Sequence, residues 1–566
     1  MSAKKSKFKA IIVTGGVISG LGKGIAAASI GYLLSSKLKI VPMKLDGYLN
    51  VDPGTMNPVE HGEVFVLDDG GEVDMDFGHY ERFLGVTCKF GQNLTMGKVF
   101  AEIRQRERRG DYLGKTVQYI PHVVDFIKSK FFEVAKNENA DIVLIEVGGT
   151  VGDIENELYI EACRQLSHDL GSENVLYVHL TYVPIPTGVG EQKSKPTQQS
   201  VNLLRERGIQ PDIIVGRCEE FLTERIKEKI AAFGGVSKTA VVSGVDVNNV
   251  YKIPLVFEKE GICEIIHKKL KIYSPPDLKK WNKLLTTLDK PTGEITIAIC
   301  GKYTALADSY ASINEALMHC SAHFRKKISL KFIETTEIEQ KKQTVKQALK
   351  GVSGVIVPGG FGNRGTEGKI EVIKYCRQNK MPFLGICLGL QLAVIEFARH
   401  VCGLTDANST EINLKTPHPV VDIMPEQAQI TNKGGTMRLG AYKAILKSKT
   451  LATKLYREGI VFERHRHRYE VNPEHHKILQ KKGLVLSGLS EDGLLAEFIE
   501  LPQSEHPYFI ATQAHPELKS HLERPAPLFF GLIDAAIKSK LAIEKKSSKL
   551  KKYSKSNKGA KSSKKS

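Results

Sequence analysis

Runs of β-branched and aliphatic residues alternate with glycine-rich turns along the first half of the chain. Residues Ala10–Thr14 precede Gly15 and Gly16, and Asp141–Val147 precede Gly148–Thr150, with an amphipathic stretch after each turn. These apolar runs are continuous rather than alternating, which is typical of parallel strands buried on both faces. We therefore predict a doubly wound α/β domain, in which ligands bind at the carboxyl ends of the strands.

The pattern lapses over residues 272–293, which are rich in proline and polar residues and can form one short helix around Trp281. A second α/β pattern begins at Glu294–Gly301 and continues through Gly354–Pro358 and Pro382–Ile386. The predicted organisation is a first domain over residues 1–271, an interdomain linker over 272–293, a second domain over 294–540 and a disordered lysine-rich tail over 541–566.

The composition is that of a soluble protein with more than one core. The chain has 566 residues, of which 41% are hydrophobic and 25% charged, and one core rarely serves so long a chain. No uncharged apolar run reaches the roughly 18 residues that span a bilayer, and the basic start, Met1–Lys9, leads into a strand-like run rather than a signal peptide. The nine cysteines contain no CxxC pair, which favours a reducing compartment. We expect a cytoplasmic protein that does not associate with membranes.

The formal charge of +18 is concentrated at one end of the chain. Between Lys538 and Ser566 there are twelve lysines and one acid, Glu544, so this segment carries +11 and the preceding residues carry +7. A lysine- and serine-rich segment with few apolar residues is expected to be disordered. It is either a solvated tail that aids solubility or a contact for RNA or another anionic surface; elsewhere the charge gives no reason to expect nucleic-acid binding.

A glycine-rich loop over Gly15–Gly24 separates the first strand from a helix that is predicted to begin near Ile25. Such a loop can turn backbone N–H groups toward phosphate oxygens, and the helix N-terminus adds its positive dipole end. Lys23 can reach the β- and γ-phosphates. The spacing differs from the usual P-loop, and Gly24 stands where a serine or threonine would bind magnesium. A purely structural turn, in which the glycines allow tight strand-to-helix packing, is the alternative.

Carboxylates that could accompany phosphates lie further along the first domain. Lys44 and Asp46 follow a short predicted strand, the stretch Asp68–Asp76 is acidic, and Glu146 ends a buried strand. Magnesium prefers one or two carboxylates together with phosphate oxygens, which makes Asp76 and Glu146 the candidate ligands. A carboxylate at the end of an apolar strand is costly without a partner. Asp68 and Asp69 are interpreted as part of a solvated loop.

The second domain contains a cysteine in a nucleophile-elbow motif. Gly385–Gly389 has the form G-x-nucleophile-x-G with Cys387 at its centre, between a predicted strand and a helix. The helix N-terminus lowers the pKa of a thiol at this position. His515 follows another predicted strand and can take the thiol proton, while Glu517 can orient the imidazole. Gly359–Gly362 can offer backbone N–H groups to an oxyanion.

Two further histidines lie in a strongly basic stretch of the second domain, and eight more cysteines are spread along the chain. His465 and His467, in the run Arg464–Arg468, are rival bases for Cys387. Nearby positive charge disfavours an imidazolium, so a substrate-binding or structural role is favoured for both. The other eight cysteines are interpreted as inert core residues.

A phosphate-binding loop and a thiol that can release ammonia from an amide form a natural pair. ATP can convert a poor oxygen leaving group into a phosphate ester, which ammonia then displaces, and an enclosed passage would keep the ammonia from being protonated.

With these features the sequence resembles the CTP synthase family, the glutamine-dependent amidoligases that convert UTP to CTP. The resemblance covers about residues 8–538 and excludes the tail. The segments that carry it are Gly15–Ile25, Lys44–Asp46, Asn50–Met56, His61–Phe65, Gly78–Phe83, Gly148–Glu155, Lys193–Gln198 and Gly434–Gly440.

The resemblance implies a P-loop-like amidoligase domain followed by a class I glutamine amidotransferase domain, and it implies roles for individual residues. Those implied for ATP are Gly20, Leu21, Gly22, Lys23, Gly24, Ile25, Lys44 and Asp76, with Asp76 and Glu146 on Mg²⁺. Those implied for UTP or CTP are Ser19, Asp153, Ile154, Glu155, Lys193, Ser194, Lys195, Pro196, Thr197, Gln198 and Lys229, of which Asp153–Glu155 would contact CTP in feedback inhibition. The implied glutaminase triad is Cys387, His515 and Glu517, and the implied glutamine-binding residues are Gly360, Leu388, Gly389, Leu390, Gln391, Glu411 and Arg468.

The resemblance also implies a homotetramer with nucleotide sites at subunit interfaces and activation by GTP through a lid that includes Arg438. It implies a place for His61 in the ammonia passage. Gly47 departs from the family, which usually has proline after the aspartate.

Two alternatives remain. Another ATP-dependent amidoligase is disfavoured by Lys193–Gln198, and a non-catalytic nucleotide-binding scaffold that polymerises is disfavoured by the intact Cys387, His515 and Glu517.

Overall fold

The computed structural model describes residues 8–56, 62–302, 310–360, 362–424, 427, 434–542 and 544. The chain divides into two compact units, Met1–Met56 with Gly71–Leu285 and Asn57–Gly70 with Thr286–Ser566. Residues 57–70 thus group with the second unit, which the linear division of the sequence did not anticipate. The lysine-rich segment 545–566 and His61 lie outside the described residues.

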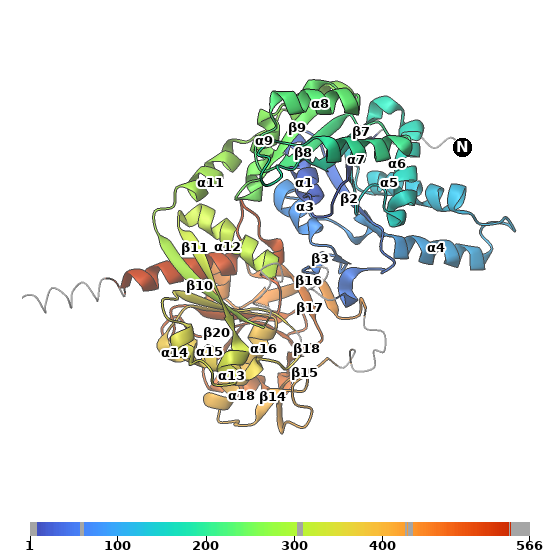
Figure 1. Cartoon of the computed structure of the whole chain (residues 1–566). Coiled ribbons are helices and arrows are strands. Elements are labelled where there is room, and N and C mark those ends of the chain that lie inside the picture. Colours follow the sequence, from blue (N-terminus) through green and yellow to red (C-terminus); the bar gives the residue numbers. More distant parts are fainter. Residues whose placement is uncertain are drawn as a thin grey trace, which may run out of the picture. The chain divides into compact units, whose positions relative to one another are not determined.

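The first unit is built on a seven-stranded sheet in the order β5-β2-β6-β1-β7-β8-β9, in which every neighbouring pair is parallel. Figure 1 labels β7, β8 and β9, which lie side by side in this sheet. Every residue of β2 and β6 is buried, as the continuous apolar runs predicted. The strands of this sheet are β1 (Lys9–Gly15), β2 (Ile40–Asp46), β5 (Asn93–Thr95), β6 (Ile142–Val147), β7 (Val175–Tyr182), β8 (Ile213–Cys218) and β9 (Val241–Val245). The unit also contains β4 (Glu72–Val73), which is outside this sheet.

Helices cover both faces of this sheet. On one face, helix α1 packs on β1, β2 and β6 and also contacts α3 and α9. On the other face, α5 and α6 contribute to a separate core. The helices are α1 (Lys23–Leu34), α3 (Asp76–Leu84), α4 (Met96–Arg109), α5 (Val124–Asn137), α6 (Glu157–Leu170), α7 (Lys195–Glu206), α8 (Glu224–Gly234), α9 (Ile253–Lys259), α10 (Ile262–Leu270) and α11 (Lys279–Asp289). The last of these is the short helix predicted around Trp281, whose side chain is buried.

The second unit has a nine-stranded sheet in the order β11-β10-β12-β13-β21-β20-β19-β16-β17. The strands from β11 to β21 are parallel, and those from β20 to β17 are antiparallel. The strands of this sheet are β10 (Glu294–Gly301), β11 (Lys327–Glu334), β12 (Gly354–Val357), β13 (Phe383–Ile386), β16 (Arg438–Leu446), β17 (Ile460–His467), β19 (Val485–Ser490), β20 (Ala496–Glu500) and β21 (Phe509–Thr512). A separate three-stranded sheet contains β14 (Ala407–Ser409), β15 (His418–Ile423) and β18 (Tyr469–Val471), and β3 (Phe65–Val66) is outside both sheets.

Helices α15 and α16 pack on the parallel strands of this sheet, and α12 packs on β11 (Figure 1). The helices are α12 (Ala311–Phe324), α13 (Thr335–Glu339), α14 (Val345–Ala348), α15 (Thr366–Asn379), α16 (Leu388–His400), α17 (Leu451–Tyr456), α18 (His476–Lys481) and a C-terminal helix over 527–542. Two layered α/β units confirm the predicted fold class. Among the described residues, none of the helices is both long and apolar enough to cross a membrane.

Three local expectations need correction. Helix α1 begins at Lys23 rather than near Ile25, so the lysine itself lies in the first turn. Strand β2 extends to Asp46, so Lys44 and Asp46 belong to the strand instead of following it. Asp68 is not part of a solvated loop, because it is half-buried and forms an ion pair with the buried Arg464; its neighbour Asp69 is exposed.

Candidate active sites

The glycine loop leads from β1 into α1 through three residues with a positive φ, Val17 (φ 78°), Gly20 (φ 75°) and Gly22 (φ 85°). A left-handed φ is costly for residues with a Cβ, which explains the glycines at positions 20 and 22. Gly22 is the residue before the helix, so the first free N–H groups of α1 follow it directly. The predicted ATP residues Leu21 and Gly24 are buried, while Gly22 and Ile25 are partly exposed.

The Lys23 side chain crosses the carboxyl end of β1. A Cβ on Gly15 would lie 2.8 Å from Cδ of Lys23, and the Lys23 ammonium donates a hydrogen bond of 2.7 Å to the carbonyl of Gly149. Burial lowers the pKa of Lys23, and the Glu146 carboxylate opposes this shift. The ammonium therefore lies at the strand ends beside the loop, where a phosphate oxygen could take the place of the carbonyl.

Asp76 explains the glycine that departs from the usual P-loop. A Cβ on Gly24 would lie 2.1 Å from Oδ1 of Asp76, so a serine or threonine does not fit unless Asp76 moves. The carboxylate of Asp76 occupies the space that the missing hydroxyl would take. In this chain the function of that hydroxyl, to bind magnesium, can be performed by Asp76 instead.

The carboxylates predicted to bind metal converge on Lys44. Its ammonium contacts Oε1 of Glu146 at 2.9 Å and also pairs with Asp76, and the Tyr80 hydroxyl donates to the second oxygen of Glu146. Glu146 therefore has the partners that its burial requires. Asp46 lies 4.0 Å from the same ammonium.

This cluster carries more negative than positive charge and suits a divalent cation. Burial, with repulsion from neighbouring carboxylates, raises the pKa of Asp46 and Glu146 and raises that of Asp74 to about 6. A bound divalent cation would offset the cost of burying these carboxylates and reduce the repulsion between them. Within the part of the chain that the structure describes, no group of three His, Cys, Asp or Glu side chains is arranged as a metal site. Asp76 and Glu146 supply the one or two carboxylates that Mg²⁺ takes from a protein when phosphate oxygens complete its coordination, so these residues fit the ion.

Five of the residues predicted to bind pyrimidine nucleotide line one cavity of about 510 Å³ in the first unit: Lys193, Ser194, Lys195, Gln198 and Lys229. Pro196 opens α7, and the Thr197 hydroxyl is buried against Thr181 and Tyr182. Ser19 and Asp153–Glu155 are exposed and do not line this cavity; the Ile154 side chain is 85% exposed. The sequence did not point to Arg225, which lines the cavity and adds a guanidinium to the three lysines.

Cys387 sits on a sharp turn between β13 and α16, with φ 52° and ψ −105°. The turn requires its glycines, because a Cβ on Gly389 would lie 2.1 Å from the Val357 carbonyl oxygen and one on Gly385 would lie 2.8 Å from the Ala511 Cβ. The thiol thus lies at the N-terminus of a thirteen-residue helix, where the helix dipole has its positive end.

The structure brings the three predicted triad residues together. His515 and Cys387 lie close enough to interact electrostatically, and Nδ1 of His515 lies 2.6 Å from Oε1 of Glu517. A Cβ on Gly359 would lie 2.9 Å from the His515 ring and 3.5 Å from Cβ of Cys387, so the glycine loop adjoins both. Burial lowers the pKa of His515, but Glu517 and Cys387 outweigh burial and raise it well above the ordinary value. The ring therefore holds a proton that can stabilise a neighbouring thiolate.

A cavity of about 150 Å³ opens beside the thiol. It is lined by Gly360, Cys387, Leu388, Gln391, Glu411, His467, Arg468 and Tyr469. Gly389 and Leu390, which were also assigned to glutamine, are buried within α16 and do not line it. Tyr469 was missed, as was Gln513, whose amide donates to the Cys387 sulfur at 3.7 Å; neither stands in a motif.

The histidines considered as rival bases belong to a buried network. His465 and His467 are hydrogen-bonded to each other at 2.9 Å, and burial with the nearby Arg438 lowers the pKa of both well below the ordinary value. Arg438 is itself held by Glu470 at 2.8 Å and Glu497 at 2.6 Å. The arrangement supports a structural role for His465, while His467 reaches the cavity beside Cys387.

Glu517→Gln should affect both activity and stability. In the parent chain, the raised pKa of His515 stabilises the folded state fully below about pH 6.5, and this stabilisation is lost as the pH rises through that raised pKa. Removing the Glu517 carboxylate lowers the pKa of His515 and so removes this stabilisation. We expect the Tm of the variant to be lower than that of the parent chain at pH 6 and the difference to shrink at alkaline pH. Glutamine hydrolysis should fall about 10²–10⁴-fold in kcat. Glu505→Gln, at an exposed loop position, is the control, and a Tm difference independent of pH would contradict the assignment.

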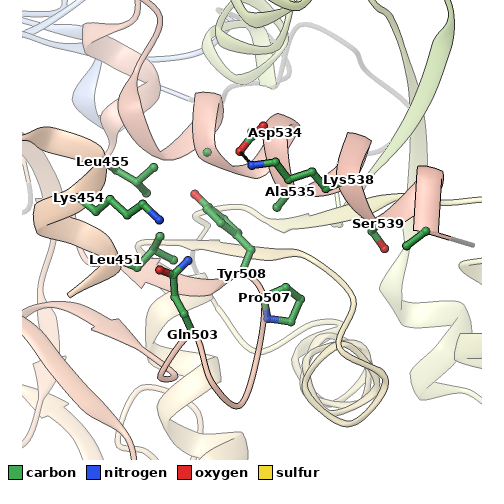
Figure 2. A pocket seen from close by; sticks show the side chains of 12 residues that line it. Leu451, Lys454, Leu455, Gln503, Pro507, Tyr508, Asp534, Ala535, Lys538 and Ser539 are labelled. Atoms are coloured by element: carbon green, nitrogen blue, oxygen red, sulfur yellow. Dashed lines mark hydrogen bonds and ion pairs between the residues drawn. The ribbon is translucent and has the colours of Figure 1, made fainter. Parts of the chain in front are cut away.

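A further cavity in the second unit, of about 450 Å³, lies between α17 and the C-terminal helix. Figure 2 shows Lys454, Gln503 and Tyr508 on its walls and the ion pair between Asp534 and Lys538 at its edge. It contains none of the residues that the sequence singled out.

Comparison with known proteins shows the family to which the two units belong. The family model described as CTP synthase N-terminus matches residues 9–272, and that described as glutamine amidotransferase class-I matches residues 305–535. CTP synthase of Borreliella afzelii is 52% identical over 540 residues, covering 94% of this chain and 100% of the relative, and that of Methanococcus aeolicus is 52% identical over 543 residues, covering 94% and 99%. A solved structure described as the Trypanosoma brucei CTPS glutaminase domain with bound acivicin is 37% identical, covers 43% of this chain and 94% of that chain, and has a TM-score of 0.40.

The chain is thus a carbon–nitrogen ligase in which a synthase domain is joined to a class I glutamine amidotransferase domain. It belongs to the CTP synthase family, and the resemblance noted in the sequence is confirmed.

Proposed function

We propose that the chain aminates UTP to CTP in pyrimidine nucleotide synthesis, with ATP as the co-substrate and glutamine or free ammonia as the nitrogen source. The observation that carries this proposal is the presence, in one chain of this family, of a lysine-bearing glycine loop in one unit and a Cys–His–Glu triad beside a small cavity in the other.

In the first unit, the glycine loop, Lys23 and Lys44 bind the phosphates of ATP and orient the γ-phosphate. Asp76 and Glu146 hold Mg²⁺, which supplies charge neutralisation on the phosphate oxygens when bound. The γ-phosphoryl group passes to O4 of UTP, ammonia attacks C4, and phosphate leaves with the former O4. The supporting observation is that these side chains meet around Lys44 at the strand ends.

UTP is proposed to enter the cavity lined by Lys193, Lys195 and Lys229, whose ammonium groups suit a triphosphate. Ser19 and Asp153–Glu155, which belong to the same proposed nucleotide site, lie outside that cavity, so a single chain presents an incomplete site. We propose that a homotetramer completes it, with CTP bound there as the feedback inhibitor. The apolar side chains exposed on this unit, including Leu113 (88%) and Ile154 (85%), support such a contact.

In the second unit, glutamine is proposed to bind in the cavity between Glu411 and Arg468, with its amide carbon against Cys387. The thiolate attacks the amide, the oxyanion faces the N–H groups of the loop around Gly360, and His515 protonates the departing ammonia. Water then releases glutamate from the thioester. GTP is proposed to activate this half-reaction as an allosteric effector, and the protein is proposed to act in the cytoplasm.

Lys229→Ala should raise the KM for UTP about 10–100-fold, because one charge-assisted contact to phosphate is lost. The KM for ATP should change less than about twofold. Lys238→Ala is the matched control, since Lys238 pairs with Glu224 and Glu228 and does not line the cavity. Steady-state rates at varied UTP decide the matter, and an equal rise in both KM values would contradict the assignment of this cavity to UTP.

The proposed function is tested by one spectrophotometric assay of CTP formation from UTP, Mg-ATP and glutamine, with and without GTP. We expect CTP to form, to require ATP, and to form faster with GTP when glutamine is the donor. Failure to form CTP from either glutamine or ammonium would refute the proposal.

A further inference from the structure

A short insertion from the first half of the chain is part of the second unit. The chain passes from the first unit to the second after Met56 and returns at Gly71. Within its described part, 62–70, four consecutive apolar residues, Val64–Leu67, are buried. Oε2 of Glu63 accepts hydrogen bonds from the backbone N–H and the hydroxyl of Ser312, at the start of α12, at 2.9 and 2.5 Å. We call residues 62–70 the inserted segment.

Asp68 joins the inserted segment to β16 and β17. Its Oδ1 accepts a hydrogen bond of 2.5 Å from Nε of Arg464, and its backbone carbonyl accepts one of 2.9 Å from the N–H of Ala441. The Arg464 guanidinium also lies over the Phe65 ring, 5.3 Å from its centre. Arg464 is almost completely buried, so the carboxylate of Asp68 balances a charge that would otherwise be costly.

Arg464, whose side chain pairs with Asp68, also contacts the catalytic His515 through its backbone. The carbonyl of Arg464 accepts the backbone N–H of His515 at 2.7 Å. Asp68 Oδ2 also lies 3.8 Å from the ammonium of Lys519, on the same 3₁₀ turn as Glu517. Lys519 in turn donates to the Phe462 carbonyl on β17 at 2.9 Å. The carboxylate of Asp68 thus contacts Arg464, whose backbone holds His515. It also lies near Lys519, on the turn that carries Glu517, the residue that orients the His515 ring.

We propose that Asp68 is a positioning residue for His515, so that hydrolysis of glutamine depends on the docked inserted segment. This inference rests on the proposed glutaminase function of Cys387. Because both ends of the segment continue into the first unit, a change there that shifts Asp68 loosens β17 at Arg464 and displaces the histidine from the thiol. The inserted segment thereby makes the release of ammonia responsive to the unit that consumes it.

Asp68→Asn in the full-length chain is the test, because asparagine keeps the volume and loses the charge. We expect kcat for glutamine hydrolysis to fall about 10–100-fold, while the KM for glutamine and the rate of CTP formation from ammonium stay within about twofold. Alkylation of Cys387 by iodoacetamide, followed by peptide mapping, should slow in parallel, because a displaced His515 stabilises less thiolate. Asp69→Asn, at the exposed neighbour, should leave all four quantities unchanged.

A second variant separates positioning from mere charge balance. Asp68→Asn combined with Arg464→Met removes the buried cation as well as its ion pair with Asp68. If Asp68 served only to balance Arg464, glutamine hydrolysis would recover in the double variant; the proposal predicts that it stays low. Hydrolysis within twofold of the parent in Asp68→Asn, or an equal loss of ammonium-dependent synthesis, would overturn the proposal. A parent chain that forms no glutamate from glutamine would instead refute the proposed function.

Discussion

Glutamine-dependent CTP formation should fall at least about 10⁴-fold in Cys387→Ala, whereas synthesis from added ammonium should stay within about twofold of the parent chain. The reason is that, within the triad, only the Cys387 sulfur forms a bond to glutamine. Lys23, Lys44 and the carboxylates beside them lie in the other unit, so the substitution does not change them. Alanine also fits the elbow, because it keeps the Cβ that already stands there and removes only the sulfur.

The control for this variant is Cys402→Ala, which removes a thiol outside the triad. Cys402 is partly exposed, and its sulfur lies 3.9 Å from the Ile478 carbonyl oxygen. Initial rates with each nitrogen source, measured on the same preparation, give the comparison. Loss of both activities in Cys387→Ala would contradict the division of labour between the two units.

Lys23→Met should remove CTP formation from either nitrogen source, by about 10²–10³-fold, because the ammonium that would stabilise the transferring phosphoryl group is lost. Methionine keeps the apolar stem that crosses Gly15 and so limits damage to the fold. Hydrolysis of glutamine, measured as glutamate in the absence of nucleotides, should continue.

Lys37→Met, at an exposed position just after α1, is the matched control. If Lys23→Met retained ammonium-dependent synthesis, the alternative that the glycines serve only as a structural turn would gain support. The two variants are reciprocal, since each should abolish one half-reaction and spare the other.

The sequence predicted those features that depend on local pattern. Continuous apolar runs identified the buried parallel strands, and Gly385 and Gly389 identified the elbow because both allow backbone approaches that a Cβ would block. His515 and Glu517 lie two residues apart beyond a strand, and the structure places both beside Cys387. These signals are short in sequence, so they needed no knowledge of the tertiary structure.

The features that the sequence did not reveal depend on contacts between distant segments. Asp68 looked like a solvated loop residue because its partner, Arg464, is 396 positions away. Gly24 looked like a defect in a P-loop because the carboxylate that fills its place, Asp76, comes from another helix. Tyr469 and Gln513 carry no motif, and only the packing of β18 and of the turn after β21 brings them to the thiol.

We propose that the nitrogen released at Cys387 reaches UTP without exchanging with ammonium in the solvent, through the enclosed passage that the sequence leads us to expect. It is tested by supplying glutamine labelled with ¹⁵N in its amide, together with UTP, Mg-ATP, GTP and an excess of unlabelled ammonium at a pH where ammonium-dependent synthesis is slow. Mass spectrometry of the CTP should then show ¹⁵N at nearly the enrichment of the glutamine. CTP whose label is diluted to that of the bulk ammonium would contradict the claim.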